Sequence, residues 1–202
     1  MRRYAFAALW LALLGQALWM IGTSIASHAL GDKAVYDSVI VAGFAALAAT
    51  GGRLRWLAAA LRVLIALAFL ASVADRFGLL GPPGASGVGW GDFAHFIAYT
   101  RTVNAFLPTS WAPALAGLAT LAEATLGLAL LLGVRLRLAA LGSAVLLLLY
   151  GTAMTLSLGI GAQFVYAVCV LSAGAWSLAV IDASALSLDG RTARRALRAA
   201  HP

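Results

Sequence analysis

The chain has 202 residues, of which 63% are hydrophobic and only 10% are charged, and its net charge is +7. A water-soluble domain usually carries about 25% charged residues, so this composition excludes a water-soluble globular domain and predicts a membrane protein built from transmembrane helices. The positive charge does not indicate nucleic-acid binding, because the arginines lie in short clusters between apolar runs, as topology signals do.

Six apolar windows are candidate transmembrane helices, and they predict an all-α, polytopic bundle of about six spans. The windows are 4–27, 35–50, 56–75, 111–133, 138–158 and 162–181. A span needs about 20 apolar residues, so the window 35–50 is the weakest. It is short and carries Asp37 near one end, so it can tilt, thin the bilayer or insert only in part. The first window has an alternative interpretation as a cleaved signal peptide, although its apolar part is longer than such peptides usually have.

The basic residues predict how the spans are oriented. Cytoplasmic loops retain Arg and Lys, and an inside N-terminus places one set of arginines in the cytoplasm: Arg2, Arg3, Arg53, Arg55, Arg135, Arg137, Arg191, Arg194, Arg195 and Arg198. The outer side then holds only Lys33, Arg76 and Arg101. We therefore expect both termini in the cytoplasm, a basic cytoplasmic tail over 183–202 and a location in the bacterial inner membrane.

The longest connection, 76–110, is expected outside the membrane and contains a second kind of helix. It opens with GLLGPPGASGVGWG, whose glycines and prolines oppose regular structure. The following stretch, DFAHFIAYTRTVNAFLP, has Asp92 as an N-cap and gathers its apolar residues on one side. This pattern predicts a short amphipathic helix at the outer interface, ended by Pro108. It can serve as a binding lid or as a linker that caps the bundle.

A single carboxylate, Glu123, interrupts the fourth apolar window. It follows Trp111 by about 12 residues, which places it roughly 18 Å deep in a hydrocarbon slab of roughly 30 Å. A charge at that depth costs at least about 2.5–3.5 kcal/mol, so the side chain should face protein or water, or be protonated. Its neighbours at helical spacing are Ala116, Ala119, Thr120, Leu126, Gly127 and Leu130, and all but the two leucines are small. We therefore expect Glu123 to point into the bundle, where another helix can approach closely.

Arg62 is the second charge inside a predicted span, and its helical stripe continues to Arg76. It can form an internal ion pair or extend its charge to the membrane surface. Side chains lean toward the N-terminus of their own helix, and the third and fourth spans run in opposite directions. A direct contact between Arg62 and Glu123 would therefore need a water or a third polar group. Glu123 and Arg62 are the candidate intramembrane polar site.

Further polar residues are expected at the outer ends of the helices. They are Asp75, Arg76, His95, Tyr99 and Arg101. Each is ordinary alone, and they become a candidate site only if they gather around the outer mouth of the bundle above Glu123.

The usual cofactor motifs do not occur in the sequence. It has one cysteine, Cys169, and no CxxC, CxxCH, Walker, Rossmann, HExxH or GxSxG pattern. Cys169 is best explained as a small packing residue. We therefore expect no metal site and no intrinsic cofactor, and no complete catalytic centre in this chain.

The stretch 62–179 resembles the DoxX-like family of small bacterial membrane proteins. Three segments carry the resemblance: LRVLIALAFLASVADRFG, FAHFIAYTRTVNAFLP and LATLAEATLGLALLLGVRLRLAALGSAVLLLLY. The last joins an intramembrane Glu to GLALLLG and an arginine-containing turn. By position, Arg62 and Glu123 match the family's intramembrane Arg and Glu.

The resemblance implies a four-helix membrane core at 56–182, with 1–55 as an additional N-terminal hairpin. Relatives include the small membrane subunit of a thiosulfate:quinone oxidoreductase and membrane components of oxidative-stress complexes. It therefore implies a membrane subunit that supports redox chemistry together with a protein partner, with quinone as a possible ligand. Two alternatives stay open: a small proton-coupled transporter or channel that uses Glu123, and a purely structural Glu123 that holds helices together.

Overall fold

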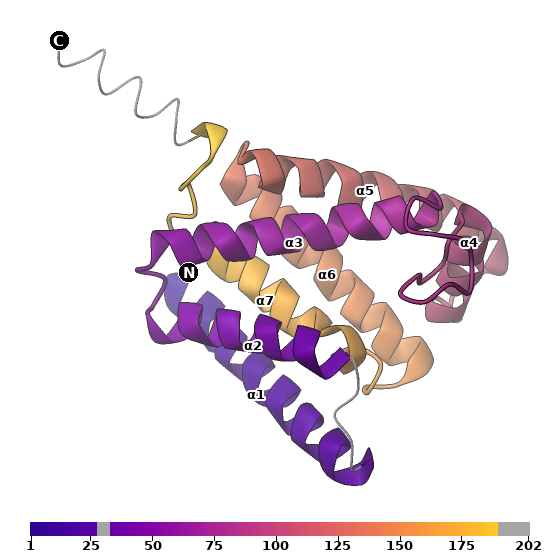
Figure 1. Ribbon diagram of the computed structural model, residues 1–202, viewed down its shortest axis with the longest axis horizontal. Coiled ribbons are helices and arrows are strands. Elements are labelled where there is room, and N and C mark those ends of the chain that lie inside the picture. Colours follow the sequence, from indigo (N-terminus) through magenta and orange to yellow (C-terminus); the bar gives the residue numbers. More distant parts are fainter. Residues whose placement is uncertain (28–32, 190–202) are drawn as a thin grey trace.

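The computed structural model describes residues 1–27 and 33–189, which form helices and turns and no strand. Seven α-helices and two short 3-10 helices follow one another in these residues (Figure 1). Their bounds are α1 Arg2–Ser27, α2 Lys33–Ala49, α3 Arg55–Arg76, α4 Phe93–Val103, η1 Thr109–Trp111, α5 Ala112–Leu132, α6 Leu136–Leu158, η2 Phe164–Tyr166 and α7 Val168–Ala179.

Four helices are long and apolar enough to cross a membrane: Arg2–Ser24, Arg55–Arg76, Thr109–Leu132 and Leu136–Leu158. They confirm an all-helical chain that is compatible with a membrane helix bundle. The apolar parts of α2 and α7, Asp37–Ala49 and Val168–Ala179, are shorter. The predicted window 162–181 does not form one continuous helix, because η2 and the left-handed Ala167 (φ 49°) precede α7. The count of six spans stays a prediction.

Helices α3 and α5 run side by side along the long axis of the molecule, and α1, α6 and α7 run at a slant to them (Figure 1). Helix α7 lies in the middle, between the α1–α2 hairpin on one side and α6 on the other, and α3 packs along α5. Side chains of α1, α2, α3, α5, α6 and α7 share one hydrophobic core cluster. Helices α1 and α2 therefore pack into the same core as the other helices.

Glycines allow the closest helix contacts in this core. A Cβ at Gly174 of α7 would lie 2.2 Å from the ring of Phe44 in α2, so no larger residue fits there without displacing the ring. A Cβ at Gly127 of α5 would lie 3.1 Å from Leu70 and 3.3 Å from the carbonyl oxygen of Ala66. The absence of a side chain at Gly127 therefore lets α5 approach α3 closely at this point.

The two ends of the bundle differ in composition. The starts of α1 and α3 and the turn between α5 and α6 lie together at one end, here called the basic end, and α4 lies at the other, the α4 end (Figure 1). Arginines flank the basic end: Arg2, Arg3, Arg53, Arg55, Arg135 and Arg137. The four arginines of the predicted tail lie at 191–198, outside the described residues. Which end faces the cytoplasm stays a prediction.

The predicted amphipathic helix is present as α4. It begins after Asp92, whose side chain accepts a hydrogen bond from the backbone N–H of His95, and it ends at Val103, before Pro108. Phe96 and Thr100 are its buried residues, and the helix packs on α5 and α6. Helix α4 therefore covers one end of the bundle.

Candidate functional site

Glu123 is buried inside the bundle, and its partner is Arg76. The Nη2 group of Arg76 in α3 donates to both carboxylate oxygens of Glu123 in α5, at 2.7 and 2.8 Å. Both side chains are 2% exposed. The two opposite charges neutralise each other where neither reaches solvent, so the mid-span carboxylate does not meet lipid as a lone charge.

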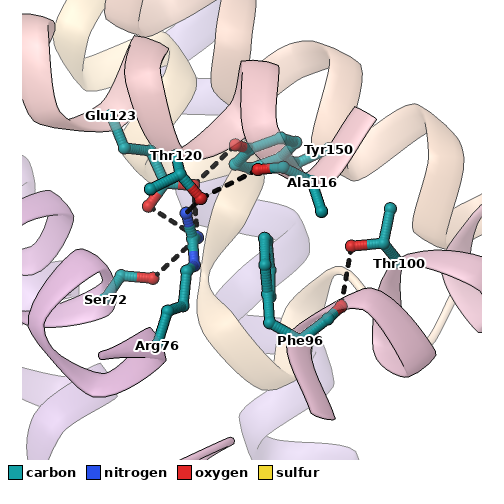
Figure 2. A network of polar contacts seen from close by, with 8 residues as sticks. All are labelled: Ser72, Arg76, Phe96, Thr100, Ala116, Thr120, Glu123 and Tyr150. Carbon is teal, nitrogen blue, oxygen red and sulfur yellow. Dashed lines mark hydrogen bonds and ion pairs between the residues drawn. The ribbon is translucent and has the colours of Figure 1, made fainter. Parts of the chain in front are cut away.

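Three hydroxyl groups complete the polar network around this pair (Figure 2). The Tyr150 hydroxyl of α6 donates to Glu123 Oε1 at 2.5 Å. Arg76 donates to Thr120 at 2.9 Å through Nη1 and to Ser72 at 3.1 Å through Nη2. The Thr120 hydroxyl in turn donates to the carbonyl oxygen of Ala116. The network therefore connects α3, α5 and α6 inside the apolar bundle.

The direction of the side chains explains why Glu123 meets Arg76. Helices α3 and α5 run in opposite directions (Figure 1), and each side chain leans toward the N-terminus of its own helix. Arg76, at the C-terminal end of α3, leans toward the middle of the bundle. Glu123, in the middle of α5, leans toward the α4 end. The two side chains approach each other, and the length of the arginine covers the remaining gap.

Aromatic rings cover the guanidinium group on the α4 side. The Arg76 Cζ atom lies 3.7 Å from the centre of the Phe96 ring and 5.2 Å from the Trp90 ring. The two rings meet edge to face, with centroids 4.9 Å apart. A cation that is shielded from water gains about 2 kcal/mol or more from such contacts. Figure 2 shows Phe96 of α4 beside Arg76.

Asp75 holds the loop that positions Trp90. Its buried carboxylate accepts hydrogen bonds from the backbone N–H groups of Gly89, Trp90 and Gly91, at 2.9, 3.0 and 3.2 Å. Three such bonds to one carboxylate fix a glycine-rich segment that has no regular structure of its own. The two adjacent residues at the end of α3 thus have different roles: Asp75 orders the loop, and Arg76 binds Glu123 inside the bundle.

The other residues of the predicted outer set are placed differently. His95 is 60% exposed and its Nδ1 lies 2.8 Å from a carboxylate oxygen of Asp92. Hydrogen bonds from the backbone and the ring of His95 hold the pKa of Asp92 below its ordinary value. Tyr99 packs beside Trp90, with ring centroids 5.6 Å apart, and burial raises the pKa of Tyr99 to about 12. Arg101 is exposed. Of the set, Arg76 belongs to the network, Asp75 and Tyr99 contact Trp90 beside it, and His95 and Arg101 are exposed.

The structure does not bring Arg62 to Glu123. Arg62 lies about 21 Å from Arg76 along α3, near the basic end, and is 2% exposed. Its guanidinium group donates to the carbonyl oxygens of Ala183 and Leu186, at 3.3 and 3.5 Å. Arg62 therefore anchors the segment that follows α7, and it neither extends to the surface nor pairs with Glu123.

Sequence reasoning missed several members of the network, although helix spacing contained a signal for some. Ser72 precedes Arg76 by one helical turn, and Thr120 precedes Glu123 by three residues, so each hydroxyl shares a face with its charge. Tyr150 and Phe96 come from other helices, and a single sequence without contact information does not identify them.

An apolar groove lies next to the network on the outside of the bundle. Its volume is about 400 Å³. Helices α3, α4 and α5 and the start of the loop line it through Val73, Phe77, Phe93, Gly117, Thr120 and Leu121. Thr120 belongs to both features, because its hydroxyl accepts from Arg76. The groove therefore connects the surface that α3 and α5 expose to the buried ion pair through one hydroxyl group.

The arrangement limits the chemistry that this site can do. Among the described residues, no group of three His, Cys, Asp or Glu side chains is close enough to hold a metal ion. Both oxygens of Glu123 already accept hydrogen bonds. The Thr120 hydroxyl donates to Ala116 and accepts from Arg76, so its proton and one lone pair are in use.

Comparison with known proteins finds no matching family model, no matching curated protein and no matching solved structure.

Proposed function

We propose that this integral membrane protein is an accessory subunit that binds a quinone-type, lipid-soluble ligand in the groove between α3, α4 and α5. In this proposal it supports the redox chemistry of a partner protein in the bacterial inner membrane. The observation that carries the proposal is the groove of about 400 Å³ whose lining includes Thr120, because Thr120 accepts a hydrogen bond from Arg76 of the buried ion pair.

The chemistry of the groove supports this class of ligand. Its walls are almost entirely apolar side chains, which suits an isoprenoid or alkyl chain that enters from the bilayer. In this proposal the ligand headgroup lies against Thr120, whose remaining lone pair would accept the hydroxyl proton of a quinol in a hydrogen bond. Arg76 donates to that hydroxyl at 2.9 Å from its other side, so the headgroup would lie next to the buried polar network.

A partner is part of the proposal because the sequence has no motif for an intrinsic redox centre. A bound quinone would supply the reversible two-electron chemistry, and we expect the electrons to come from another protein. The resemblance of 62–179 to DoxX-like proteins motivates the same interpretation, because that family includes the small membrane subunit of a thiosulfate:quinone oxidoreductase. In this proposal the chain binds and orients the ligand, and its buried network keeps the groove in shape.

The main alternative, a proton-coupled transporter or channel that uses Glu123, receives less support from the geometry. A midplane proton carrier must exchange its proton with water on either side. Here the carboxylate is 2% exposed, Arg76 and Tyr150 occupy its oxygens, and Phe96 covers Arg76 from the α4 end. Proton flux into proteoliposomes that disappears in Glu123→Gln, without loss of folded protein, would favour the transporter.

Ligand-dependent thermal stability tests the proposal. A short-chain ubiquinone analogue, in its reduced quinol form and at about 100 times its Kd, should stabilise the purified protein by about 2.7 kcal/mol, which corresponds to a rise in Tm of about 5–10 °C. The variant Gly117→Leu should lose this rise. A Cβ at Gly117 meets no atom within 4 Å, so the leucine can fill the groove without disturbing the helix.

Gly22→Leu is the matched control, because a Cβ at Gly22 of α1 also meets no atom within 4 Å and the residue lies far from the groove in the sequence. This variant should keep the full stabilisation by the quinone analogue. The proposal is wrong if the wild-type protein shows no stabilisation, or if Gly117→Leu and Gly22→Leu respond alike.

A further inference from the structure

A second cavity lies at the basic end, opposite the groove. Its volume is about 510 Å³, and it is lined by residues at the start of α1, the start of α6 and the end of α7. Arg2 and Arg137 are its basic lining residues, while Leu136, Leu178 and Ile181 give it apolar walls. Charged groups beside an apolar wall at the end of membrane-length helices are typical of the boundary between headgroups and acyl chains.

The two arginines come from distant parts of the sequence and are held differently. Arg2 donates to the carbonyl oxygen of Gly51, and its Cζ atom lies 5.9 Å from the centre of the Phe6 ring. These contacts hold the guanidinium in one place, so little conformational freedom is lost when it binds a ligand. Arg137 is exposed and lies in the first turn of α6, whose N-terminal dipole also favours an anion.

Two carboxylates also line the cavity, and each accepts a hydrogen bond from a backbone N–H group. Asp189 accepts from the backbone N–H of Leu136 at 3.0 Å, and Asp182 accepts from that of Ser184 at 2.9 Å. Both acids keep their negative charge and balance Arg2 and Arg137, so the excess positive charge of the lining comes from the amine of Met1, which also lines the cavity. The planar guanidinium group of an arginine can donate two parallel hydrogen bonds to the oxygens of a phosphate.

We propose that this cavity binds the phosphate group of an anionic phospholipid, with Arg2 and Arg137 as the phosphate ligands. The acyl chains of this lipid would lie against the apolar wall that Leu136, Leu178 and Ile181 provide. The site is separate from the α3–α5 groove and does not depend on the function proposed for it. It would retain one lipid between α1, α6 and α7.

Lipid retention tests this site. The detergent-solubilised protein is titrated with phosphatidylglycerol or with phosphatidylcholine, and bound lipid is counted by native mass spectrometry. The wild-type protein should retain one phosphatidylglycerol in preference to phosphatidylcholine. Replacing both guanidinium groups, in Arg2→Gln/Arg137→Gln, should weaken phosphatidylglycerol binding by about tenfold or more.

The control Arg53→Gln/Arg55→Gln removes the same charge from the same end, at exposed residues that do not line the cavity. It should bind phosphatidylglycerol as the wild type does. The single variant Arg137→Gln changes only an exposed side chain, so it tests the site even if the double variant with Arg2 does not fold, and it should bind several-fold more weakly.

Three results would overturn the proposal. Equal losses in the two double variants would show that general positive charge, and not the cavity, attracts the lipid. Equal retention of phosphatidylglycerol and phosphatidylcholine would show that the headgroup charge is not recognised. If inorganic phosphate displaces the lipid at equimolar concentration, the site binds free phosphate, and the apolar wall does not contribute to lipid binding.

Discussion

The buried ion pair makes a specific prediction about stability. In Arg76→Met, Glu123 keeps the hydrogen bond from Tyr150 but loses both contacts with the guanidinium, at 2.7 and 2.8 Å. Both side chains are 2% exposed, so no solvent replaces the lost charge. Breaking a buried pair by removing one partner costs about 3–5 kcal/mol, because the other charge stays buried and uncompensated.

The double variant Arg76→Met/Glu123→Leu should be more stable than Arg76→Met alone. It leaves no unpaired charge, and replacing both members of a buried pair with apolar residues is often close to neutral. The coupling energy in the cycle of wild type, two single variants and the double variant should therefore amount to several kcal/mol. Arg101→Met is the matched control, because Arg101 is exposed on α4, and its change should stay within about 0.5 kcal/mol.

Unfolding in mixed micelles, followed by circular dichroism with increasing SDS, measures these free energies. The reasoning about the buried pair is refuted if Arg76→Met changes stability by less than about 1 kcal/mol, or if the two single effects add in the double variant.

Further predictions concern the surroundings of the pair. Tyr150→Phe removes one hydrogen bond to a charged group and should cost about 1.5–3 kcal/mol in the same assay, whereas Tyr4→Phe, at an exposed residue, should not change stability. Asp75→Asn weakens the acceptor for three backbone N–H groups, so limited proteolysis should cut the loop before α4 faster without unfolding the helices. The pKa of Asp92 is lowered in the folded chain, so the Asp92 cap stabilises α4 at any pH above the unfolded pKa of about 3.9. This stabilisation is lost as the pH falls through the lower folded pKa. Hydrogen exchange in the first turn of α4 should become faster in that pH range, and Asp92→Asn should remove the pH dependence.

The depth and direction of Glu123 could be predicted from the sequence. A carboxylate about halfway through an apolar window has to face other helices, and small residues at helical spacing mark the side that allows their approach. The N-cap at Asp92 and the start of α4 could also be predicted, because an Asp before an amphipathic run is a signal that depends only on the neighbouring sequence.

The partner of Glu123 was harder to identify, because it depends on how far α3 and α5 are shifted along each other. Two arginines, Arg62 and Arg76, lie on one stripe of α3, and either can face α5. Gly127 lets α5 approach Ala66 and Leu70 of α3 closely, and the shift follows from such packing between residues that are distant in the sequence. The lean of side chains toward the N-terminus of their helix already favoured Arg76 over Arg62.

The order in the loop before α4 could not be predicted, for the same reason. Glycines and prolines indicate an irregular segment, and nothing local shows that Asp75 binds the N–H groups of Gly89, Trp90 and Gly91. The role of Trp90 as a cover for Arg76 follows only from those long-range hydrogen bonds. The two cavities are also products of packing, since each combines residues from three helices or more.

Photolabelling with an azido-quinone analogue tests the central claim most directly, because it reports where a quinone-type ligand sits. Purified protein in lipid nanodiscs is illuminated with the analogue, and the modified peptides are identified by mass spectrometry with and without excess unlabelled quinone. The account predicts competed adducts on residues that line the groove, on α3 near Val73 and on α5 between Gly117 and Ala124. Adducts that are not competed, or that lie mainly on α1, α2 or the basic end, would contradict it.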